Sequence, residues 1–217
     1  MTSSEFISTC EDKGMKALLE DIANRGFTVP TLSAIKNNIN KGSYVDFAKA
    51  IADSLNINYD QTQNDTRLFN YINDLSRDIT DQYGAFRAQA FSSDLKLNWF
   101  RYVGSNVTIT RPFCIAMTEK DFFHRCEIPS ILEGNFPEFQ KQHDHSYEET
   151  GIPSGFYANT DETNFFVYRG GYGCRHQIFP IPDSAVPENI KMELYDQKEY
   201  KEWILKNRPG NKSEKDL

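Results

Sequence analysis

The sequence predicts an α+β fold, in which an N-terminal helical region with a long amphipathic helix precedes a small mixed domain with a short antiparallel sheet. Apolar residues recur at steps of three and four through the first part of the chain, which is the period of a helix. Strand-forming residues and turn glycines become frequent only after Asp94. We therefore expect a helical region for partner binding at 1–95, a Cys/His-containing domain at 96–190, and a C-terminal helix with a polar tail at 191–217.

The helical region is expected to begin with short helices. The apolar residues Met15, Leu18, Leu19 and Ile22 form one face of a predicted helix, and Gly26 and Pro30 are expected to end its pattern. The segment from Ser43 to Asp46 resembles a capping box with Asp in place of Glu. It predicts the start of a further helix, whose apolar face consists of Phe47, Ile51 and Leu55.

A longer apolar stripe predicts one helix of roughly 25 residues, with a spacing near the coiled-coil period of about 3.5. Its members are Leu68, Ile72, Leu75, Ile79, Tyr83, Phe86 and Ala90. We favour packing of this helix on its own domain, and a seam against a neighbouring subunit is the alternative.

Strand-forming segments predict the sheet of the second domain. We expect strands at 97–103, 107–110 and 165–168, the first two joined by a turn. The polar and aromatic stretch 135–163, with scattered Gly and Pro, is expected to be a long irregular loop. A charged helix at about 197–206 should precede a disordered tail at 209–217.

Composition narrows the class of protein. A net charge of −7 argues against a free-standing nucleic-acid binder, which usually carries a basic face. No apolar run approaches the roughly 20 residues that span a bilayer, so no membrane partner is expected. The first ten residues lack a basic start and an apolar stretch, which argues against secretion. The four cysteines are therefore expected to be thiols in a reducing cytoplasm.

Two clusters in the second half carry most of the chemical information. The first comprises Thr110-Arg111-Pro112-Phe113-Cys114 and then Phe123-His124-Arg125-Cys126-Glu127-Ile128. The second is Gly170-Gly171-Tyr172-Gly173-Cys174-Arg175-His176, followed by a segment with Pro180 and Pro182. Glycines before a Cys-x-His pair allow a tight turn that can place both side chains near a common point. Such a point suits a metal, a buried hydrogen-bond network, or a nucleophile with its base.

The order of these segments resembles the phage Mu F-like minor head proteins, a family of tailed-bacteriophage head-morphogenesis proteins. The resemblance runs from Arg87-Ala88-Gln89-Ala90 through Trp99-Phe100-Arg101-Tyr102-Val103-Gly104 and the two clusters, roughly residues 80 to 185. It implies a virion protein assembled in the host bacterial cytoplasm, non-catalytic, associated with the portal, the major capsid protein or copies of itself as a homo-oligomer. A head-tail connector or neck position is the variant of this role that stays open.

The cysteines and the histidine allow three readings. A structural cluster of Cys114, Cys174 and His176 with Arg111 and Arg175 is the one we favour. Zinc could instead bind Cys114, Cys174 and His176, with Cys126 or His124 as the fourth ligand. A disulfide between Cys114 and Cys174 would close a loop of sixty residues and stabilise the fold by roughly 3–4 kcal/mol.

Catalysis and transient binding are the rival functions. A Cys–His hydrolase, a peptidase or a toxin-like enzyme, would use Cys114 or Cys174 as nucleophile and His176 as base, but the orienting group, Glu127 or Asn106, could be nominated only arbitrarily. An assembly adaptor or chaperone is the other rival. Arg111 and Arg175 could contact phosphate of packaged DNA, although a guanidinium that ties loop carbonyls together is the reading we favour.

Overall fold

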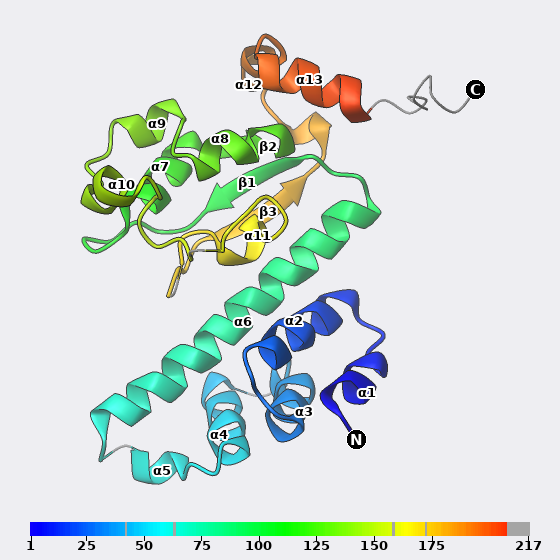
Figure 1. Ribbon diagram of the computed structural model, residues 1–217, viewed down its shortest axis with the longest axis vertical. Helices are drawn as coiled ribbons and strands as arrows, with labels where there is room; N and C mark the ends of the chain where they lie inside the picture. The colour runs from blue at the N-terminus through cyan, green and yellow to red at the C-terminus, as the bar shows by residue number, and fades with distance from the viewer. Residues whose placement is uncertain (42, 63, 158, 172, 208–217) are drawn as a thin grey trace.

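The long helix α6, Thr66–Asp94, separates two layers of the chain in the computed structural model (Figure 1). The structure describes residues 1–41, 43–62, 64–157, 159–171 and 173–207. Short helices pack on one side of α6, and a sheet with its covering helices packs on the other. The predicted α+β fold with a helical N-terminal region is confirmed.

The helical layer is built from α1 Ser3–Ser8, α2 Lys13–Asn24, α3 Val29–Asn38, α4 Tyr44–Ser54 and α5 Tyr59–Thr62. The predicted first helix is α2, and Gly26 follows it at a φ of +92°, a backbone conformation that favours glycine. Pro30 does not end a pattern, because it lies in the first turn of α3, where a missing N–H costs nothing.

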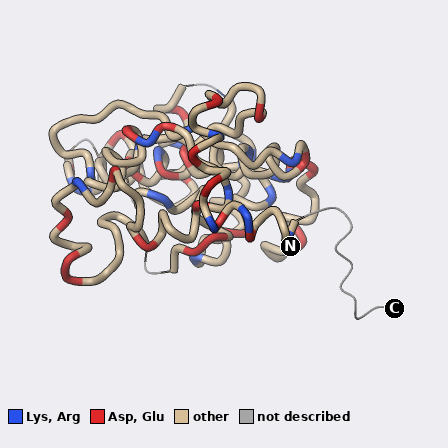
Figure 2. Tube along the Cα trace, turned by 90° about the horizontal axis from the view of Figure 1, so that it is seen from above, with Lys and Arg blue, Asp and Glu red and all other residues tan. Residues whose placement is uncertain are grey.

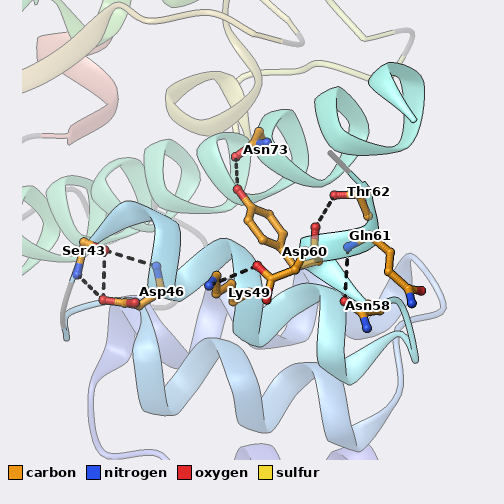
Figure 3. A network of polar contacts seen from close by, with 9 residues as sticks. Ser43, Asp46, Lys49, Asn58, Asp60, Gln61, Thr62 and Asn73 are labelled. Atoms are coloured by element: carbon orange, nitrogen blue, oxygen red, sulfur yellow. Dashed lines mark hydrogen bonds and ion pairs between the residues drawn. The ribbon is translucent and has the colours of Figure 1, made fainter. Parts of the chain in front are cut away.

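The predicted capping box begins α4. Ser43 accepts a hydrogen bond from the backbone of Asp46, and the Asp46 carboxylate accepts one from the backbone of Ser43, at 3.2 and 3.1 Å (Figure 3). The same view shows the ion pair between Lys49 and Asp60, at 3.3 Å, which joins α4 to α5. Side-chain contacts of this kind fix the ends of short helices that would be marginal alone.

The apolar stripe of α6 packs within the chain. Ile72, Ile79 and Tyr83 are buried, and the other stripe members are half-buried. Ile79 and Tyr83 belong to one core with α1 to α4, while Ile72 packs with α4 and α5. The stripe is therefore an internal seam, and the alternative of a seam against another subunit is wrong for this face of α6.

The sheet has β1, Trp99–Val103, at its centre. In the described residues it pairs antiparallel with β2, Phe122–His124, on one side and with β3, Gln177–Ile181, on the other. The register places Trp99 opposite His124 and Tyr102 opposite Ile178. Because β1 is central, its aromatic residues Trp99, Phe100 and Tyr102 are buried, and Tyr102 is only 1% exposed.

The elements around the sheet are short. They are α7 Pro112–Lys120, the 3₁₀ turn η1 Arg125–Glu127, α8 Ile128–Leu132, α9 Pro137–Gln140, α10 His145–Thr150, α11 Phe165–Tyr168, the 3₁₀ turn η2 Asp183–Ala185, α12 Glu188–Tyr195 and α13 Lys198–Asn207. Aromatic rings dominate the core that they form with the sheet, including Phe100, Phe113, Phe123, Phe165 and Phe166. A few large rings thus supply a core in a chain with modest apolar content.

Three expectations for this region are wrong. Residues 107–110 form a turn rather than a strand. The Thr110 backbone N–H donates a hydrogen bond to the Val107 carbonyl, and Ile109 is 89% exposed. Phe165–Tyr168 is helical, so this short apolar run is a buried helical turn against α6. The stretch 135–163 contains α9 and α10 rather than one long irregular loop.

The C-terminal helices α12 and α13 pack beside β2 (Figure 1). The charged helix predicted at about 197–206 is α13, and helix α12 begins at Glu188, before the boundary expected at 191. The expected tail at 209–217 lies outside the described residues. None of the helices in the described ranges combines the length and the apolar character needed to cross a bilayer. Within the described residues, acidic and basic positions are interspersed along the trace (Figure 2).

Candidate Cys/His site

Three segments far apart in the sequence meet at one end of β1. Tyr102 comes from β1, Cys114 from α7, and Cys174 and His176 from the loop that leads into β3. Pro112 is the first residue of α7, where its fixed φ suits the helix start, and the buried Cys114 follows on the first turn. We call Cys114, Cys174 and His176 the Cys/His cluster.

Glycines before Cys174 shape the loop as the sequence predicts. Gly170, Gly171 and Gly173 have φ values of 70°, 68° and 69°, which other residues rarely adopt. A Cβ on Gly170 would lie 2.5 Å from the Cys174 sulfur and 3.0 Å from the Cys114 sulfur. Only glycine at this position lets the two sulfurs approach.

The ligand atoms of the cluster are close together. The Sγ atoms of Cys114 and Cys174 are 3.7 Å apart, and the Cys174 Sγ is 3.8 Å from His176 Nδ1. All three cysteine and histidine atoms lie within 4.8 Å of one another. The Tyr102 hydroxyl lies 3.4 Å from the Cys114 sulfur and 3.7 Å from the Cys174 sulfur. Both cysteines are free thiols in this structure, so no disulfide joins them.

His176 is held on both sides. Its ring stacks on Tyr102 with centroids 5.5 Å apart, and its Nε2 is 3.3 Å from Asn106 Oδ1. The His176 carbonyl accepts a hydrogen bond of 2.7 Å from the buried Arg169 guanidinium. Gly104 leaves room for the ring, because a Cβ there would lie 2.2 Å from His176 Cδ2.

The environment separates the two thiols electrostatically. The hydrogen bond with Cys114 lowers the pKa of Cys174 well below its usual value, with further help from His176 and Arg169. The same hydrogen bond and burial raise the pKa of Cys114. Burial also keeps the pKa of the Tyr102 hydroxyl well above its usual value, so this group is a neutral donor. Cys174 is therefore the sulfur on which negative charge is stabilised, a property that both a metal ligand and a nucleophile need.

The two arginines of the predicted site differ. Arg111 donates a hydrogen bond of 2.6 Å to the Gly170 carbonyl, so it ties α7 to the glycine loop. Arg175 is exposed, and its charge acts on the α6 carboxylate of Asp81, whose pKa burial nevertheless raises. The carbonyl-tying role favoured for these arginines fits the position of Arg111.

Cys126 and His124 do not join the Cys/His cluster. His124 Nδ1 lies 3.0 Å from the Cys126 sulfur, and the ring packs on Trp99 and Trp203. Trp99 and Tyr102 are about 10 Å apart along β1 and point to opposite faces, because they are three residues apart on a strand. The fourth zinc ligand expected from this pair is therefore not at the cluster.

A small cavity lies between the cluster and α6. Its volume is about 20 Å³, and its lining includes Asp81, Gln82, Arg169 and Cys174. Gln82 Oε1 and Arg169 Nε are buried there without a hydrogen-bond partner among the described residues. Such a cavity has room for about one water molecule. Larger hollows of about 470 to 600 Å³ lie elsewhere, and none of their lining residues belongs to the cluster.

Sequence reasoning missed Tyr102 and Arg169 as members of this site. The signal for Tyr102 was its place on a predicted strand rich in aromatic residues, and that for Arg169 was a cation directly before two turn glycines. Asn106, which the sequence could nominate only arbitrarily as a partner of His176, lies beside it.

No protein family, no curated protein and no solved structure matches this chain.

Proposed function

We propose that this chain is a non-catalytic structural or morphogenetic protein of a tailed-phage head or neck. The observation that supports it most is the meeting of the motifs behind the Mu F-like resemblance. The Trp-Phe-Arg-Tyr-Val strand, the Thr-Arg-Pro-Phe-Cys helix start and the Gly-Gly-Tyr-Gly-Cys-Arg-His loop lie together at one site. Motifs that form one packed site depend on one another, which is what a shared structural domain requires.

The geometry of the site suits a structural role. Cys114 and His176 are buried, Arg111 and Arg169 hydrogen-bond to loop carbonyls, and the adjoining cavity has room for about one water. A substrate pocket is usually a cleft of about 300 Å³ or more. The cluster therefore joins β1, α7 and the glycine loop into one unit.

The partners that we propose for this protein are those that the Mu F-like resemblance implies. The portal, the major capsid protein and further copies of the chain are the partners we propose. Because the apolar stripe of α6 is used internally, other surfaces have to make these contacts. Packaged DNA is a weaker candidate, since the chain has a net charge of −7 and its acidic and basic positions are mixed along the described trace (Figure 2).

The test is absolute quantification of the chain by mass spectrometry in phage particles from the organism that encodes it. A fixed number of copies in DNA-filled heads supports the proposal. Presence only in empty precursors would replace it with the adaptor or chaperone role. Absence from both would overturn it.

A Cys–His hydrolase is the second candidate, because one observation favours it. Cys174 Sγ, His176 and Asn106 form a chain of contacts of 3.8 and 3.3 Å, the order of nucleophile, base and orienting amide. Timed alkylation of the folded protein separates the two functions. A nucleophile predicts that Cys174 reacts faster than the half-buried Cys10, and a structural thiol predicts that it reacts more slowly.

A further inference from the structure

We propose that the Cys/His cluster binds one Zn²⁺ ion through Cys114 Sγ, Cys174 Sγ and His176 Nδ1. A tetrahedral zinc site with Zn–S bonds of about 2.3 Å and Zn–N bonds of about 2.05 Å has S···S and S···N edges of about 3.8 and about 3.6 Å. The observed separations are 3.7 Å between the sulfurs and 3.8 Å between Cys174 Sγ and His176 Nδ1. Two of the three edges therefore match such a site, and the third, between Cys114 and His176, is no longer than 4.8 Å.

The tautomer of His176 is the second observation, and it follows from a chain of hydrogen bonds. The Thr118 hydroxyl donates to the Ile115 carbonyl at 2.8 Å, so it accepts the hydrogen bond of 2.8 Å from Asn106 Nδ2. The Oδ1 atom of Asn106 then faces His176 Nε2 at 3.3 Å, and this nitrogen carries the proton. The lone pair of His176 Nδ1 is thus directed to the side of Cys174, as a metal ligand requires.

Zinc-bound histidines usually have a hydrogen bond of this kind on their other ring nitrogen. The non-ligating nitrogen of such a histidine donates to an oxygen that orients the ring, here that of Asn106. The Tyr102 hydroxyl faces both sulfurs and can donate to a thiolate.

The charge of the loaded site also fits its burial. Two thiolates and a neutral imidazole balance the two charges of Zn²⁺, so the loaded site has no net charge of its own in a buried place. The cavity of about 20 Å³ beside Cys174 has room for one solvent molecule, and solvent takes the fourth position. Its unpartnered Gln82 Oε1 and Arg169 Nε provide polar contacts for that solvent.

The experiment is elemental analysis and native mass spectrometry of the full chain, purified without chelator. We expect one zinc per chain, which is lost in the Cys174→Ser and His176→Ala variants. The chain offers a matched control in His124-Arg125-Cys126, a second cysteine–histidine pair two residues apart, whose atoms are 3.0 Å apart. The Cys126→Ser variant should keep its zinc.

A wild-type protein without zinc, with all four thiols alkylated after unfolding, would overturn the assignment, as would equal zinc loss in Cys126→Ser. If the ligand variants fail to fold, cobalt loading of the wild type replaces them, because its charge-transfer absorption counts the thiolate ligands and two are expected. Asn106→Ala should weaken zinc affinity by about 10- to 100-fold. The assignment does not depend on the phage role: a zinc-bearing chain that is absent from particles would overturn the proposed function alone.

Discussion

His124 should make the protein sensitive to mild acid. Its ring is 3% exposed, and its Nδ1 accepts a hydrogen bond of 3.2 Å from the Cys126 backbone, which caps the turn η1. Burial lowers the pKa of His124 to about 4, and the nearby charge of Arg125 adds to the effect. Protonation would place a charge among the rings of Trp99 and Trp203 and remove the acceptor.

The sign and the size follow from linkage. Because the pKa is lower in the folded state, about 4 against 6.5 unfolded, the unfolded chain binds more protons as the pH falls below 6.5. The stability that neutral His124 contributes is therefore present at pH 7.5 and lost as the pH falls through about 4. Between pH 7.5 and 5 the loss is about 2 kcal/mol, or a fall of about 4–8 °C in Tm for a chain of this size.

The assay is urea unfolding of the wild type and the His124→Asn variant, in chelator, at pH 7.5, 6 and 5. Asn can still accept the hydrogen bond from the Cys126 backbone, but it does not titrate. The variant can be less stable at every pH because aromatic packing is lost. The difference in free energy of unfolding between the wild type and the variant should shrink by about 2 kcal/mol between pH 7.5 and 5. Parallel pH profiles would refute it.

Three further substitutions test other contacts. Burial raises the pKa of Asp78 to about 6, so Asp78→Asn should raise the free energy of unfolding at pH 7, by about 1 kcal/mol after solvent screening. The gain should vanish below about pH 4, and urea unfolding at both pH values checks this. The Asn side chain can keep the hydrogen bond from Gly173. Gly104→Ala should lower the free energy of unfolding by about 1–3 kcal/mol, because the added Cβ would meet the ring of His176. An unchanged Tm would contradict this close packing of Gly104 on His176. Ile79→Ala should cost about 2–5 kcal/mol in urea unfolding, since Ile79 is fully buried in the seam of α6, and a loss below about 0.5 kcal/mol would place that seam elsewhere.

Local sequence patterns predicted much of the helical part of the fold. The stripe on α6 was visible because 29 residues repeat one helical period. The capping box at Ser43 needs only two side chains three residues apart, so it could be recognised without tertiary information. The closeness of Cys174 and His176 was expected from the glycines before them, whose positive φ values the structure has.

The errors arose where tertiary contacts decide the conformation. Phe165–Tyr168 is an apolar run of four residues, too short to distinguish a strand from a buried helical turn, and α6 makes it helical. Residues 107–110 are rich in strand formers, but no strand among the described residues pairs with them. The strand that pairs with β1 in their place is Phe122–His124, which has three residues and is defined only by this pairing. Arg169 also depends on contacts that the sequence does not show, since its role rests on the position of the His176 carbonyl.

If the Cys/His cluster holds the second domain together, unfolding of the His176→Ala variant should show it. Loss of the stacked ring and of its buried contacts should lower the free energy of unfolding by at least about 2 kcal/mol, and the Tm with it. The half-buried Cys10 lies in the helical layer, so Cys10→Ser is the control and should unfold like the wild type. An unchanged unfolding curve for His176→Ala, together with loss of an activity of the protein, would contradict the structural role and leave the hydrolase in its place.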